Sequence, residues 1–141
     1  MSGLDRPEQE PLRVSILAQR AYLIASIHTA LDDEHFERFQ KDLIDQIGRR
    51  RARGVVIDVA ALDVLDSFGS RTLHDLGQVA RLRGAETVVV GIQPEVAFAM
   101  VRFGINLNSM YTALDLEEGL SLLDQLGGSD AELRGSGHRA R

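Results

Sequence analysis

The sequence of 141 residues contains no cysteine, and only one of its 16 basic residues, Lys41, is a lysine. The absence of cysteine excludes disulfide bonds, thiolate metal sites and a cysteine nucleophile. Lys41 has no glycine-rich turn around it and stands in a polar helical stretch, which excludes a P-loop and argues against a Schiff-base lysine. What remains, with 44% apolar and 26% charged residues, is the composition of one globular domain that needs no cross-link.

Long apolar runs and an excess of basic residues are missing too. No run approaches the ~20 apolar residues that span a bilayer, and the acidic, proline-containing residues 1–11 do not resemble a signal peptide. The net charge of -5 and the pI of about 5.3 disfavour nucleic-acid binding. The arginine run at 49–51 is better interpreted as a helix end than as a phosphate site. We therefore expect a cytoplasmic protein that binds neither membranes nor nucleic acid.

Apolar spacing predicts alternating strands and helices. Two short runs, 12–17 and 21–27, predict a β-hairpin, and the continuous apolar runs at 55–57 and 87–90 predict parallel strands covered on both faces. Amphipathic spacing and capping signals predict further elements: helices over 33–51, 67–83, 94–104 and 115–126, and a short strand within 106–112. The order predicts an α/β fold with a mixed sheet of four to five strands and helices packed against it.

One domain is expected over residues 12–127. Residues 1–11 are predicted to be a flexible N-terminus. Gly127-Gly128 is predicted to end the last helix, and the small, polar residues 128–141 are predicted to be a disordered tail.

Residue patterns for catalysis are weak. The four histidines lack metal-ligand spacing, and no Gly-x-Ser-x-Gly motif is present, so we expect neither metal nor cofactor. A small hydrolase using Asp63, Asp66, Ser67 and His74 remains a distant hypothesis. Asp66 and Ser67 are adjacent and need not face each other, and nothing marks an oxyanion hole.

The segment 58–70 is the strongest functional candidate, because it joins a buried strand to a helix, where open α/β sheets bind their ligands and partners. Ser67 falls at the helix start. A plain N-cap serine is the ordinary interpretation. The functional interpretation is a phosphoacceptor, whose added charge at the positive helix end would crowd Asp58, Asp63 and Asp66 and repel a docked partner without backbone motion.

Segments 54–58 and 63–68 resemble the STAS domain, the fold of anti-sigma-factor antagonists, and within it the RsbS branch of stressosome scaffolds. Further stretches agree at 31–33, 91–94 and 112–120. The resemblance covers roughly residues 12–126.

The resemblance implies a non-enzymatic scaffold. Such proteins assemble with sensor-bearing STAS paralogues of the RsbR type and hold a GHKL serine kinase of the RsbT type, which is released when it phosphorylates the STAS serine. A PP2C-type phosphatase of the RsbX type resets the system. A homodimer and a large hetero-oligomer are implied. Ser67 matches the phosphorylated serine, and Asp66 matches the acid before it. The residues that we predict to flank the phosphosite and bind partners are Asp58, Asp63, Asp66, Phe68 and Gly69.

One departure bears on an alternative function. Sporulation-type antagonists have a small residue and then glycine after the serine, whereas here Phe68 intervenes, as in the RsbS branch. The alternative, an anti-anti-sigma factor that binds an anti-sigma kinase directly, shares the fold and the serine but not the large assembly. Phe68 is expected either to stay exposed as a partner contact or to face the sheet.

The chain also starts almost at the first strand, which we expect leaves no room for a sensor domain.

Overall fold

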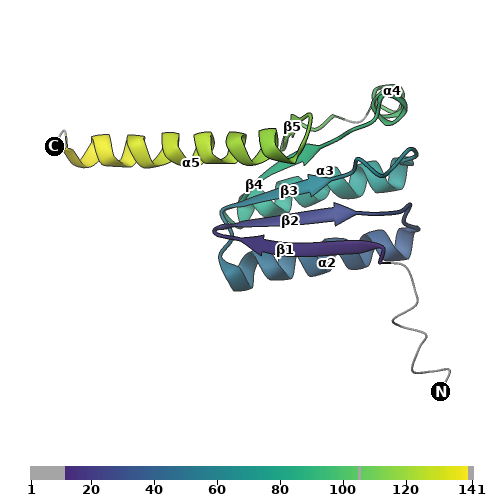
Figure 1. Ribbon diagram of the computed structural model, residues 1–141, viewed down its shortest axis with the longest axis horizontal. Helices are drawn as coiled ribbons and strands as arrows, with labels where there is room; N and C mark the ends of the chain where they lie inside the picture. The colour runs from purple at the N-terminus through teal and green to yellow at the C-terminus, as the bar shows by residue number, and fades with distance from the viewer. Residues whose placement is uncertain (1–11, 105, 140–141) are drawn as a thin grey trace, which may run out of the picture.

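The computed structural model describes residues 12–104 and 106–139, with side chains described to residue 127, so the predicted flexible N-terminus lies outside the described residues. Within this part, five strands form one sheet with four helices around it, which confirms the predicted α/β class (Figure 1). The elements are β1 (Val14–Gln19), β2 (Tyr22–Ile27), α2 (Asp33–Arg50), β3 (Gly54–Asp58), α3 (Ser67–Leu82), β4 (Glu86–Val90), α4 (Pro94–Arg102), β5 (Tyr111–Ala113) and α5 (Leu116–Arg139).

The strands follow one another across the sheet in sequence order. β1 and β2 form the predicted antiparallel hairpin, turned at Arg20 with φ of 57°, and β2 to β5 are parallel. The helices α2, α3 and α4 each follow a parallel strand. The ends of β2, β3 and β4 and the starts of these helices therefore share one border of the sheet, which we call the carboxyl edge.

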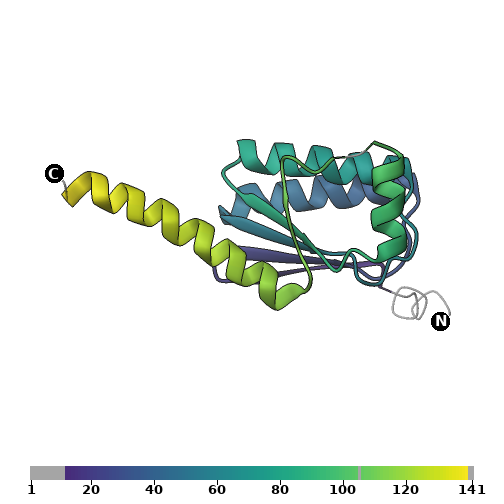
Figure 2. The same ribbon diagram turned by 90° about the horizontal axis from the view of Figure 1, so that it is seen from above.

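Alternating strand residues build two apolar layers. Val55 and Ile57 point to the face covered by α2 and α3, and Val56 points to the face covered by α5 (Figure 2). A run buried on both faces is what the continuous apolar stretch of β3 predicts. Helix α5 is also tied to the sheet by the Tyr22 hydroxyl, which donates to Asp124 Oδ1 at 2.6 Å. Burial and this hydrogen bond raise the pKa of Tyr22 to about 12.

The last helix differs from its prediction. Helix α5 runs to Arg139 and does not end at Gly127-Gly128, so the predicted helix end is wrong and the backbone of residues 128–139 is helical where a disordered tail was expected. A glycine pair costs a helix about 1 kcal/mol per residue but does not remove the backbone hydrogen bonds, as proline does.

No described helix is long and apolar enough to cross a membrane.

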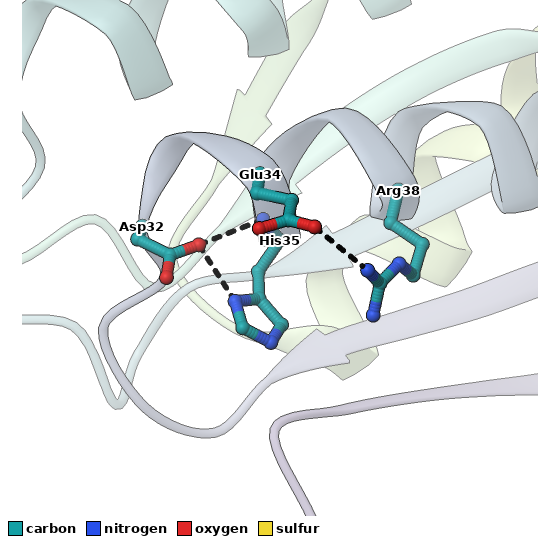
Figure 3. A network of polar contacts seen from close by, with 4 residues as sticks. All are labelled: Asp32, Glu34, His35 and Arg38. Atoms are coloured by element: carbon teal, nitrogen blue, oxygen red, sulfur yellow. Dashed lines mark hydrogen bonds and ion pairs between the residues drawn. The ribbon is translucent and has the colours of Figure 1, made fainter.

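The first turn of α2 is fixed by an aspartate cap. Asp32 Oδ1 accepts from the His35 backbone N–H at 2.8 Å and contacts His35 Nδ1 at 2.6 Å, and one turn further Glu34 contacts Arg38 (Figure 3). The two contacts with His35, the backbone one foremost, hold the pKa of Asp32 below its ordinary range.

This cap predicts a pH-dependent contribution to stability. Because the folded state lowers the pKa of Asp32, its stabilisation is complete above the pKa of the unfolded chain, near 4, and is lost as pH falls through the lower folded value. Asp32→Ala should therefore lower the free energy of unfolding near neutral pH and lose this deficit in acid, measured by urea denaturation across pH. Asp32→Asn, an uncharged cap, is the control. A deficit that is equally large at pH 7 and pH 3 contradicts the prediction.

Candidate functional site

The loop between β3 and α3, residues 59–66, is fastened to the neighbouring β4–α4 turn. The Val59 N–H donates to the Val90 carbonyl at 3.0 Å, and Gln93 Nε2 donates to the Ala60 carbonyl at 2.7 Å. Asp58 Oδ1 accepts from the Ala60 N–H at 2.9 Å, which makes the first turn of the loop. The loop therefore has a defined path at the carboxyl edge.

Close packing against the loop explains one glycine. Gly91 has φ of +80°, and a side chain there would place its Cβ 2.8 Å from the Cβ of Ala60. On its inner side the loop buries Leu62 and Leu65, which belong to the core under α2 and α3. One turn, two hydrogen bonds to the β4–α4 turn and two apolar anchors thus hold the loop, which leads directly into the first residue of α3.

Asp66, rather than Ser67, caps α3. The Asp66 side chain accepts from the Gly69 N–H at 2.8 Å, and its carbonyl accepts from the Ser70 N–H at 2.9 Å. Ser67 is therefore the first residue inside the helix, so the ordinary interpretation of Ser67 as the N-cap is wrong. Aspartate and serine are equally good caps, and the two are adjacent, so the sequence alone did not separate them.

The Ser67 side chain is partly exposed at this helix start. The next two hydroxyls of the helix, Ser70 and Thr72, are only 0% and 6% exposed. The N–H groups of Ser67 and Phe68 lie in the first turn, where no helix carbonyl can accept them. The geometry thus leaves one hydroxyl within reach of an external reactant, beside two backbone donors.

Phe68 has an intermediate position. It is partly buried and packs against the core, and its carbonyl accepts from Thr72 Oγ1 at 2.9 Å. Gly69, also predicted as a contact residue, is buried, and an added Cβ would lie 2.7 Å from the Phe36 ring and 2.8 Å from the Leu65 side chain. Gly69 therefore serves the packing of α2 against α3 and offers little surface to a partner.

Sequence reasoning missed Val64. Its side chain is 65% exposed in the middle of the loop, between the buried Leu62 and Leu65. The sequence contained one signal of this exposure. Val64 is a large apolar residue that stands between the solvated Asp63 and the core residue Leu65. Val64 is an apolar side chain three residues before Ser67 that faces solvent.

Acidic side chains surround the loop. Asp63 and Asp66 are exposed and Asp58 is half-buried. Helix α2 starts at the same edge, with Asp33 and Glu34 in its first turn. Because Phe36 of α2 touches the position of Gly69 in α3, these two helix starts lie next to each other. Acidic residues therefore lie in the loop before Ser67 and at the neighbouring helix start, and their crowding around a phosphate at Ser67 stays a prediction.

The geometry gives no support to the hydrolase hypothesis. His74 lies two turns along α3 from Ser67, roughly 10 Å by helix rise, and contacts Asp75 at 3.6 Å. The Asp66 carboxylate is occupied by the cap. Among the side chains that the structure describes, no cluster of histidine and acidic residues is suited to hold a metal ion.

The Asp66 cap yields a stability prediction. Asp66→Ala removes the acceptor for the Gly69 N–H and should lower the free energy of unfolding by ~1 kcal/mol, measured by urea denaturation. Asp66→Asn keeps a side-chain acceptor and should cost clearly less. Equal losses for the two variants would show that the charge, and not the hydrogen bond, stabilises the helix start.

Comparison with known proteins agrees with this architecture. The STAS domain model matches residues 14–118. A solved serine-to-glutamate variant of RsbS from Moorella thermoacetica is 36% identical with a TM-score of 0.74, covering 82% of this chain and 98% of that one. A structure from a study of stressosome architecture is 34% identical with a TM-score of 0.67, covering 80% and 98%.

Curated relatives of the RsbT co-antagonist type are longer than this chain. The RsbT co-antagonist protein RsbRA of Bacillus subtilis (strain 168) is 29% identical over 90 residues, which are 64% of this chain and 33% of that protein. The chain thus spans about a third of the length of the curated relative it matches. The family model and the shared fold agree, and the chain belongs to the STAS domain family, where it is similar to RsbS.

Proposed function

We propose that this protein is a non-enzymatic signalling scaffold of the RsbS type, which sequesters an RsbT-type serine kinase and releases it when Ser67 is phosphorylated. The observation that carries the proposal is the partly exposed Ser67 at the first residue of α3, directly after a firmly held loop that carries the exposed Asp63 and Asp66. The likeness to RsbS and to an RsbT co-antagonist supports the choice within the family.

Two opposing electrostatic effects within the domain act on a phosphate at Ser67. The helix start and the free N–H groups of Ser67 and Phe68 favour it by roughly 0.3–1 kcal/mol. A carboxylate at about 4 Å in water disfavours it by about 1 kcal/mol per unit charge. The two effects are of similar size, so we expect the phosphate to leave the fold unchanged.

The added phosphate instead changes the binding of the partner. Phosphoserine adds a charge of about −1.5 to −2 to a surface already lined by Asp63 and Asp66. Val64 and the exposed part of Phe68 offer apolar contact on the same surface. A kinase bound there meets a new charge in the middle of its contact, which lowers its affinity and releases it.

The proposal includes the other members of the system. Sensor-bearing paralogues of the RsbR type join this chain in a large cytoplasmic hetero-oligomer, and a PP2C-type phosphatase of the RsbX type removes the phosphate from Ser67. The supporting observations are the likeness to a stressosome structure and to RsbRA. The protein itself contributes a surface and a phosphoacceptor and needs no catalytic residue or cofactor.

Phosphate transfer to Ser67 is tested with an RsbT-type kinase and ATP, followed by intact-mass measurement and mapping of the phosphopeptide. The Ser67 hydroxyl oxygen should take the terminal phosphoryl group of ATP, releasing ADP and the hydroxyl proton. Ser67→Ala should abolish incorporation. The matched control is Ser70→Ala, which removes a buried hydroxyl without a hydrogen-bond partner among the described residues and should leave incorporation unchanged. Undiminished phosphate on the Ser67→Ala protein contradicts the proposal.

A further inference from the structure

A pocket of about 420 Å³ lies at the border of the sheet opposite the carboxyl edge, which we call the amino edge. Its walls come from residues at or beside the starts of β2, β3, β4 and β5 and from the part of α5 up to Gly127. Helix α5 continues past the strands at this edge (Figure 1). We infer that the pocket binds a small organic molecule that carries a single carboxylate on an apolar body.

The strand register and one glycine form the inner part of the pocket. Tyr22, Gly54 and Glu86 are paired across β2, β3 and β4, so they form one row on the face covered by α5. A Cβ at Gly54 would lie 2.9 Å from the terminal carbons of Leu123. The missing side chain therefore lets Leu123 pack directly on the sheet as the inner wall, with Tyr22 and Glu86 on either side.

The apolar lining suits the body of a small ligand. Leu123 is buried, and Leu126, Tyr22 and Tyr111 are partly exposed around it. Clefts that bind small molecules measure roughly 300–1,000 Å³ and combine apolar walls with a few polar groups that orient the ligand. The pocket at the amino edge has this size and this combination.

Three charged side chains line the pocket, and only one of them lacks a partner among the described residues. Asp124 Oδ1 accepts the hydrogen bond of the Tyr22 hydroxyl at 2.6 Å, and Glu86 Oε1 lies 3.5 Å from Arg81 Nη2. Arg53 has no described carboxylate within ion-pair distance. An arginine binds a carboxylate with two parallel hydrogen bonds, so the carboxylate of a ligand supplies the partner that Arg53 lacks.

The two acidic side chains limit the charge of that ligand. Glu86 and Asp124 belong to the same lining as Arg53 and repel any negative charge beyond the one that Arg53 balances. A phosphate monoester or a dicarboxylate is therefore disfavoured. A molecule with one carboxylate leaves the lining with the smallest unbalanced charge.

The inference goes beyond the proposed function, because the pocket contains no residue of the β3–α3 loop or of the α3 start. A bound molecule touches the strand starts and α5 together, so it adds to the hydrogen bond between Tyr22 and Asp124 in holding α5 on the sheet. Ligand binding and phosphorylation of Ser67 thus use opposite edges of the sheet.

An amide NMR titration of the full chain with phenylpropionate tests the inference. The shifts should saturate at Tyr22, Arg53 and Glu86 with a dissociation constant below ~1 mM, while Ser67 stays unshifted. Phenylpropionamide, which has the same shape without the charge, should bind roughly tenfold more weakly. The absence of saturable shifts at these three residues, or equal affinity for the two compounds, overturns the inference.

Two variants separate the charge from the space. Arg53→Gln should weaken the binding of phenylpropionate roughly tenfold. The matched control is Arg71→Gln, which changes an exposed arginine outside the pocket and should bind as the wild type does. Leu126→Trp fills the pocket and should abolish binding while the amide spectrum still shows a folded domain. Undiminished affinity in the Arg53→Gln protein or in the folded Leu126→Trp protein contradicts the inference.

Discussion

The hydrogen bond from the Gly69 N–H to the Asp66 carboxylate determines how Ser67 is presented. Because Asp66 fills the cap position, Ser67 is the first residue of the helix, and its hydroxyl is not needed to hold the helix start. A serine at the cap would point its oxygen back at the backbone, where modification would remove the cap. Under the proposed function, this separation of the cap from the phosphoacceptor would let the protein keep its fold in both states.

The second constraint is the attachment of the loop to the β4–α4 turn through Val59, Ala60 and Gln93. A held loop fixes the position of a charge added at Ser67 relative to Asp63 and Val64. Under the proposed function, the signal would be a change of surface charge at Ser67 that a bound partner senses directly.

The sequence predicted the sheet and the helices well, because their apolar residues recur with clear periods. The continuous run of β3 and the acids before α2 each reflect one dominant effect, burial on both faces and a helix N-terminus. Positions where two effects compete were harder. Asp66 and Ser67 are both good caps, Gly127-Gly128 weakens a helix without ending it, and the exposure of Val64 depends on tertiary packing. The role of Ser67 rests on its resemblance to the family and stays a prediction.

The most direct test of the account compares amide NMR spectra of the protein before and after phosphorylation. A switch by charge alone predicts large shifts at the N–H groups of Ser67 and Phe68 and small shifts in the immediate neighbourhood, with the β1–β5 sheet unchanged. Widespread shifts through α3 and the strands, showing a rearranged backbone, would contradict it.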